Sequence, residues 1–182
     1  MADVRRARQG DARFIAVAWF EGWQRAYRGL LPDAVLDRMS IDAGEARWAG
    51  YLEDLPPSVR LWVSEHERAV VGYGLTGPSR DISDDDREAV AEVYAIYLRP
   101  ALWGTGIGRE LFAHAIADLR SRGYLAATLW VVEANARARR FYERAGLSPD
   151  GARRMEKFDG AEAEEVRYRV VFDLENPTRG QG

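Results

Sequence analysis

The sequence contains no cysteine, only two histidines and a single lysine among its 182 residues. The absence of cysteine excludes a thiol nucleophile, a disulfide framework and any zinc or iron–sulfur site built on thiolates. His66 and His114 lie far apart in the sequence, so we expect no histidine-based metal site. Lys157 is the one candidate for Schiff-base chemistry, because the other cationic side chains are arginines, which supply charge but no nucleophile near neutral pH.

The sequence also lacks a basic block and a long apolar run. Its net charge is −3 and its pI is about 5.5, so we expect no nucleic-acid partner. No stretch of about 18 apolar residues occurs, and the N-terminal residues are charged, so we expect a cytoplasmic protein without a membrane partner. The length fits one domain, which we place at residues 1–174, followed by a polar tail at 175–182.

The first part of the chain is predicted to form a short strand and three helices. Residues 4–7 fit the strand. Apolar residues recur at helical spacing from Asp11, a candidate N-cap, to a stop at Gly29. A proline opens a second helix over 32–39, and a serine caps a third helix that begins at Ser40 and stops before two prolines.

From residue 59 onward, alternating and continuous apolar segments predict strands separated by two more helices. The expected strands are 59–63, 69–76, 88–98, 125–132, 152–158 and 165–172, and the expected helices are 106–122 and 135–144. An acidic run, Asp84–Asp86, lies in the loop before the long strand and either attracts a cation or is simply solvated. The order of elements is typical of a mixed α/β domain.

Three glycines join the long strand to the helix that follows, in the segment Trp103-Gly104-Thr105-Gly106-Ile107-Gly108. Backbone amides in such a turn, together with the helix dipole, favour an anion. Arg109 stands where a dinucleotide fingerprint needs its last glycine, and a Walker loop would need a lysine here. Taken alone, the segment fits either a phosphate cradle of another type or a tight turn in which glycine supplies positive φ.

A second segment bears on the choice between a phosphate cradle and a tight turn. It runs Leu129-Trp130-Val131-Val132-Glu133-Ala134-Asn135 and continues with Ala138, Phe141-Tyr142-Glu143 and Gly146-Leu147. Together with the strand and the glycine turn, it resembles the GNAT superfamily of acyl-CoA-dependent N-acetyltransferases over about residues 88–147. The resemblance implies an α/β fold with a mixed, mostly antiparallel central sheet, splayed middle strands and helices on both faces. Trp103 stands where the family usually has Arg or Gln, a departure that concerns a side-chain contact and not the fold.

The resemblance implies acetyl-CoA as cosubstrate, bound without a metal. The backbone of Ile96 and Leu98 would hydrogen-bond the pantetheine arm, and the Leu98 amide would polarise the thioester carbonyl. Backbone amides from Gly104 to Arg109 would hold the pyrophosphate. The implied cofactor-binding residues are Ile96, Tyr97, Leu98, Trp103, Gly104, Thr105, Gly106, Ile107, Gly108, Arg109, Asn135, Ala138 and Tyr142.

The family reaction is direct attack of a neutral amine on the thioester. An alkylamine of pKa ~10.4 is neutral in only about one part in 2,500 at pH 7, so a general base is useful. Glu92 lies six residues before Leu98, where many GNAT enzymes place the base, whereas Trp130 stands where others carry a glutamate. Burial in an apolar strand is expected to raise the pKa of Glu92, which would act directly or through a water. The alternative is a structural carboxylate that pairs with an arginine or faces solvent.

Tyr142 aligns with the family's general acid, which protonates the departing thiolate; the alternative is a core aromatic. Asn135 is expected to cap its helix and to contact the pantetheine. Trp23 and Tyr27, with Trp19, recur at helical spacing and either wall the acceptor cleft or belong to the core. The acceptor is expected to be a primary amine of a small molecule or protein.

Three further hypotheses concern the oligomeric state, a non-catalytic role and nucleic-acid binding. A homodimer is common among relatives, and the closing strands offer contacts for one. A non-catalytic module that binds or senses CoA is the alternative to the enzyme, and the presence of both Glu92 and Tyr142 favours the enzyme. A nucleic-acid-binding α/β domain is disfavoured by the acidic pI.

Overall fold

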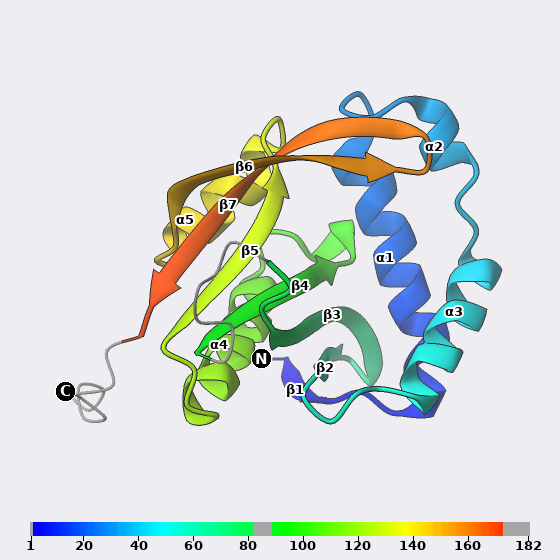
Figure 1. Ribbon diagram of the computed structural model, residues 1–182. Helices are drawn as coiled ribbons and strands as arrows, with labels where there is room; N and C mark the ends of the chain where they lie inside the picture. The colour runs from blue at the N-terminus through cyan, green and yellow to red at the C-terminus, as the bar shows by residue number, and fades with distance from the viewer. Residues whose placement is uncertain (1, 82–88, 173–182) are drawn as a thin grey trace.

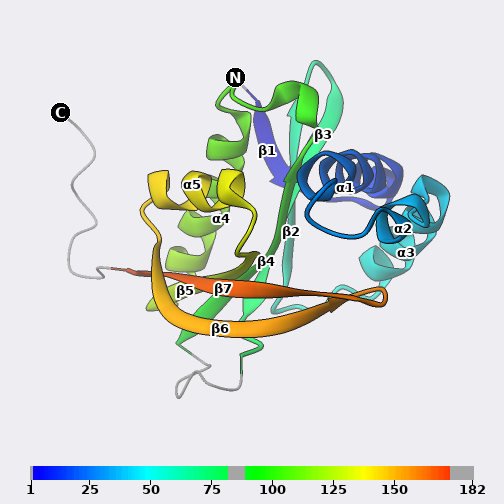
Figure 2. The same ribbon diagram turned by 90° about the horizontal axis from the view of Figure 1, so that it is seen from above.

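Seven strands form one twisted sheet in the computed structural model, which describes residues 2–81 and 89–172. The sheet order is β1-β2-β3-β4-β5-β7-β6, and all neighbours are antiparallel except β4 and β5, which are parallel. The strands are β1 (Asp3–Arg6), β2 (Arg60–His66), β3 (Ala69–Pro78), β4 (Val90–Leu98), β5 (Ala126–Val132), β6 (Ser148–Phe158) and β7 (Ala161–Val171). Helices cover both faces (Figure 2). The predicted fold class is confirmed, whereas Asp84–Asp86 and the tail at 175–182 lie outside the described residues.

Helices α1 (Ala12–Tyr27), α2 (Asp33–Asp37) and α3 (Ile41–Glu53) lie on one face. The Ser40 hydroxyl accepts a hydrogen bond from the Ala43 amide at 3.4 Å and caps α3 as predicted. Asp11 also stands at the predicted N-cap of α1, but its carboxylate makes no capping bond there. It accepts instead from the Arg8 amide at 2.8 Å and from the Arg5 guanidinium at 2.7 Å, across a short 3₁₀ turn, η1 (Gln9–Asp11).

Two apolar layers hold the helices on the sheet. On the first face, α1 and α3 bury Ile15 and Trp48 against β2 and β3, and the Trp48 and Tyr73 ring centroids lie 4.9 Å apart. On the second face, α4 (Ile107–Ser121) and α5 (Ala136–Arg144) pack on β4, β5 and β7. Leu119 and Tyr168 are fully buried in that layer. This burial of apolar side chains on both faces is the main source of stability for such a sheet.

The middle of the sheet opens because β4 and β5 pair over a short stretch only. Their register joins Val90–Glu92 to Ala126–Thr128, and the Thr128 hydroxyl donates to the Ala91 carbonyl at 3.2 Å. Beyond this point β4 continues to Leu98 and β5 to Val132 without pairing to each other in the described strands. The two strands diverge in Figure 1, and the splayed middle strands of the predicted fold are thereby confirmed.

The β6–β7 hairpin is longer than the sequence predicted and reaches across to α1 and α2 (Figure 1). Its turn places Asp159 and Gly160 at φ of 47° and 91°, the left-handed pair of a two-residue hairpin turn. Asp159 accepts from Arg38 at 2.9 Å, and the Phe158 ring lies 5.7 Å from that of Trp23. Lys157 lies beside the turn with 82% of its side chain exposed. No helix within the described ranges is long and apolar enough to cross a membrane.

Candidate functional site

A cavity of about 830 Å³ occupies the gap between β4 and β5. Its wall includes the β4 residues from Val93 to Leu98, the glycine turn and one side of α5, and it also includes Gly22, Ala26 and Tyr27 of α1 on the other face. The cavity therefore reaches both faces of the sheet. The predicted site residues that line it are Tyr27, Ile96, Tyr97, Leu98, Trp103, Gly104, Thr105, Gly106, Gly108, Arg109, Asn135, Ala138 and Tyr142.

The glycine turn closes one end of this cavity. It follows a short 3₁₀ turn, η2 (Pro100–Leu102), and Gly104 and Gly106 adopt φ of 86° and 96°, which residues with a side chain rarely adopt. Gly106 is the N-cap of α4, so the first amides of the helix point out of its N-terminus toward an anion. Two amides of the segment predicted to hold the pyrophosphate already donate within the protein: that of Arg109 to the Gly106 carbonyl at 3.0 Å, and that of Thr105 to the Leu102 carbonyl at 3.4 Å. Ile107 turns its side chain away, into a cluster with Val71 and Leu98.

The cavity wall is cationic. Four arginines line it, Arg109, Arg137, Arg140 and Arg144, and none of the described carboxylates either lines the cavity or pairs with them. The Arg137 guanidinium stacks 4.2 Å above the Trp103 ring. Uncompensated guanidinium groups beside a glycine turn fit a ligand with several phosphate charges. The sequence analysis did not single out Arg137, Arg140 and Arg144 of α5. Their spacing of three and four residues nevertheless places them on one face of the helix.

Both backbone polar groups of Leu98 face the gap. The Arg99 amide donates to the Val71 carbonyl of β3 at 2.9 Å, so the residue before it must point the other way in an antiparallel ladder. The Leu98 carbonyl accepts from the Trp103 indole at 2.9 Å, on the side of the cavity. The Leu98 amide is thus presented to the gap, in the orientation that its expected role requires.

Helix α5 supplies the opposite wall. The Asn135 side chain accepts from the Ala138 amide at 3.1 Å and caps the helix as predicted. Tyr142 lines the cavity, and its ring centroid lies 5.8 Å from Phe112 and 6.2 Å from Tyr168. Burial raises the pKa of the Tyr142 phenol, so this group stays protonated well above neutral pH.

The structure separates the two aromatic residues that were predicted to bind the acceptor. Tyr27 lines the cavity, where hydrogen bonds with Tyr97 and Asn135 partly offset the rise that burial produces in the pKa of Tyr27. Trp23 does not line the cavity. The Trp23 ring centroid lies 4.7 Å from that of Tyr27 and 5.7 Å from that of Phe158. Trp23 therefore packs against Tyr27 outside the cavity wall.

Glu92 occupies the last position at which β4 pairs with β5, at the root of the gap, and only 3% of it is exposed. Its carboxylate accepts three hydrogen bonds from Arg80: from the amide at 2.9 Å, from Nε at 3.3 Å and from Nη2 at 2.6 Å. Glu92 does not line the cavity. The pairing with an arginine is the structural alternative considered above, and the role of general base stays a prediction.

Comparisons with known proteins give one consistent result. The profile of the Acetyltransferase (GNAT) family matches residues 17–147. An uncharacterised N-acetyltransferase of Mycobacterium tuberculosis is 31% identical over 67% of this chain and 72% of its own length. The PaiA N-acetyltransferase of Thermoplasma acidophilum, solved in complex with coenzyme A, has a TM-score of 0.70 at 17% identity, covering 94% of this chain and 99% of that chain. The protein yncA of Salmonella typhimurium, solved with its cofactor acetyl-CoA, has a TM-score of 0.69 at 21% identity, covering 100% of this chain and 99% of that chain.

Proposed function

The chain belongs to the acetyltransferase (GNAT) family, and from this premise we propose that it transfers the acetyl group of acetyl-CoA to a primary amine of a small molecule or protein. The cavity between β4 and β5 carries the proposal. It combines an uncompensated cationic wall, a glycine turn at a helix N-terminus and a free backbone donor on a strand edge. Coenzyme A presents the matching groups, which are phosphates at one end and an extended, amide-bearing arm at the other.

The residues of the gap fit this cosubstrate in two parts. Amides of the glycine turn would hold the pyrophosphate, helped by Arg109 and Arg137. The edge of β4 from Ile96 to Leu98 would hydrogen-bond the pantetheine arm as a strand partner would. When bound, acetyl-CoA supplies an acyl group that is activated as a thioester, and no metal is needed. The described residues contain no group of side chains that could hold a metal ion.

The reaction forms a nitrogen–carbon bond and breaks the carbon–sulfur bond of the thioester. The Leu98 amide would donate to the carbonyl oxygen as negative charge develops there. Glu92 would take the proton from the amine through a chain of waters, because its carboxylate lies behind the cavity wall and Glu92 stands six residues before Leu98 in β4. Tyr142 would donate a proton to the sulfur as it leaves, and the raised pKa of the Tyr142 phenol keeps that proton in place until then.

Incubation with acetyl-CoA and a mixed library of amines tests the proposal, with thiol release and product mass as readouts. Calorimetric binding of CoA, measured in parallel, tests the cavity separately. We expect both CoA binding and at least one acetylated amine. CoA binding without an acetylated product would favour a non-catalytic CoA-binding module. The absence of CoA binding would reject the assignment of the cavity.

A further inference from the structure

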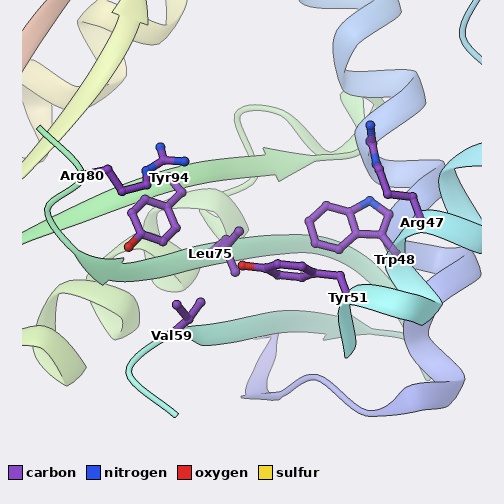
Figure 3. A pocket seen from close by; sticks show the side chains of 7 residues that line it. All are labelled: Arg47, Trp48, Tyr51, Val59, Leu75, Arg80 and Tyr94. Carbon is purple, nitrogen blue, oxygen red and sulfur yellow. The ribbon is translucent and has the colours of Figure 1, made fainter. Parts of the chain in front are cut away.

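A second pocket, of about 610 Å³, opens on the side of the sheet that carries α1 and α3 (Figure 3). Val59 and Leu75 form its apolar base, and Trp48, Tyr51 and Tyr94 form aromatic walls. None of the roles assigned above uses this pocket. Its lining suits the apolar body of an organic ligand, because large aromatic side chains bury apolar surface effectively.

The ends of the pocket are cationic. Arg47 and Arg80 lie at opposite ends of it in Figure 3, and none of its described lining residues is acidic. The Arg47 guanidinium stacks 4.5 Å above the Trp19 ring, and no described carboxylate pairs with it. Arg80 binds Glu92 through its Nε and Nη2 atoms, which leaves Nη1 without an acceptor among the described residues. Arg80 is thus already paired, whereas the Arg47 guanidinium, with which no described carboxylate pairs, lies beside an apolar trough and is suited to a carboxylate.

Tyr94 lines both this pocket and the cavity between β4 and β5, so the two lie next to each other at this residue. From Tyr94 the cavity wall follows β4 to Leu98, a path of roughly 13 Å at about 3.3 Å per residue. A ligand with its anionic end in the pocket and its amine at Leu98 must span that path. An extended peptide of about four residues covers that stretch of β4, since each residue adds at most ~3.3–3.6 Å, and a peptide that also crosses the pocket to Arg47 is longer (Figure 3).

We propose that the pocket between α3 and β3 binds the terminal carboxylate of the acetyl acceptor, and that the acceptor is a short peptide of more than four residues. Arg47 holds the carboxylate, the aromatic walls pack against the side chains of the peptide, and the peptide amine lies at Leu98. This inference rests on the proposed function, because it names the substrate class of the same reaction.

The experiment compares an alanine–leucine hexapeptide as the free acid with its C-terminal amide. Binding of each to the CoA-loaded protein is measured by calorimetry, and acetylation is followed by product mass. We expect the free acid to bind about tenfold more tightly and to show a correspondingly lower KM. The advantage should disappear for the dipeptide pair, which is too short to reach both ends.

Arg47→Gln should remove the difference between acid and amide while leaving the KM for acetyl-CoA unchanged, and Arg47→Lys should restore part of it. Arg68→Gln, in the distant β2–β3 turn, is the matched control and should change nothing. We test Arg47 rather than Arg80 because Arg80 also holds Glu92.

Three outcomes would overturn the inference: equal binding of acid and amide, binding that does not depend on Arg47, or tight binding of the free acid without its acetylation in a protein that acetylates other amines. In each of these cases the proposed function still stands. Failure to acetylate any amine would reject the proposed function instead, and it would reject the peptide as acceptor with it.

Discussion

The indole Nε1 of Trp103 donates a hydrogen bond to the carbonyl oxygen of Leu98 at 2.9 Å. Since the carbonyl and the amide of Leu98 both face the gap, this bond satisfies the acceptor and leaves the donor to the ligand. The side chain that departs from the family pattern thus holds the peptide group that directly follows the Leu98 amide. Its ring also supports Arg137.

Trp103→Phe should therefore lower kcat/KM for acetyl-CoA by about three- to tenfold, which corresponds to one net hydrogen bond. Phenylalanine keeps an aromatic face for Arg137 but has no donor for Leu98. Trp103→Ala removes both interactions and should be more damaging. Steady-state kinetics with acetyl-CoA as the varied substrate measures the effect, and equal activity of the wild type and Trp103→Phe would show that the bond to Leu98 has no role.

Glu92→Gln should preserve CoA binding and lower turnover by roughly 10²-fold or more, the usual contribution of a general base. The loss should be largest at low pH, where neutral amine is scarcest, and should shrink as the pH rises toward the pKa of the amine. A pH–rate profile with one fixed amine measures this. A thermal melt accompanies it, because the change also removes the charge that Arg80 pairs with. A uniform loss across pH that follows the drop in Tm would assign Glu92 a structural role only.

Tyr142→Phe should lower kcat with little change in the Kd for acetyl-CoA. Burial raises the pKa of the Tyr142 phenol above its usual value of 10, so the acid form persists as the pH rises through the alkaline range. We therefore expect no loss of wild-type activity between pH 7 and about pH 10 from ionisation of this group. Normal turnover of the variant with several amines would exclude the role of general acid.

Gly22→Ala should destabilise the protein and disturb the acceptor side of the cavity. A Cβ at this position of α1 would lie 2.9 Å from the Cδ1 atom of Tyr97, so the ring must move. Overpacking of this kind costs about 1–3 kcal/mol and outweighs the gain of about 1 kcal/mol in helix propensity. Gly50→Ala in α3 is the matched control, because nothing lies within 4 Å of its Cβ and it should be stabilising. Urea denaturation of both variants measures whether each substitution lowers or raises the free energy of unfolding.

Asp11 should make the fold sensitive to acid. Burial raises the pKa of Asp11, but hydrogen bonds from Arg5 and the Arg8 amide outweigh it and hold that pKa below 3.8. A carboxylate with a lowered folded-state pKa stabilises the protein above its unfolded pKa of ~3.9, and the stabilisation is lost as the pH falls through the folded value. Asp11→Asn should cost about 2 kcal/mol at pH 7, and this cost should shrink as the pH falls through the lowered folded-state pKa of Asp11. A stability–pH curve with equal slopes for both proteins would contradict this.

Much of the fold could be predicted from the sequence because local signals, such as helix caps and turn residues, agree with the global structure. The helices on both faces begin at predicted caps such as Ser40 and Asn135, and the glycine turn lies where the motif indicated. Strand β6 was underestimated because it is an edge strand with most of its side chains exposed, so its start carries no apolar alternation.

The geometry of the site was harder to predict from the sequence, since it depends on contacts between segments that lie apart in the chain. The ion pair joins Glu92 of β4 to Arg80 in the segment that follows β3, and no local sequence pattern predicts it. Tyr27 lines the cavity and Trp23 does not, because the two side chains leave α1 in different directions. Helical spacing alone does not resolve these directions. The amine acceptor, the homodimer and the cellular compartment stay predictions.

Lys157 gives the chain an uncommon experimental property. It is the only ε-amino group in the sequence, and 82% of its side chain is exposed, one residue before Phe158 in the hairpin that covers Trp23. An amine-reactive fluorophore can therefore attach to one lysine and otherwise only to the α-amino group. Such a label sits beside α1 and would report on movement of the hairpin during turnover. The same scarcity simplifies mass spectra, because acetyl groups on the chain itself have only two amines to occupy.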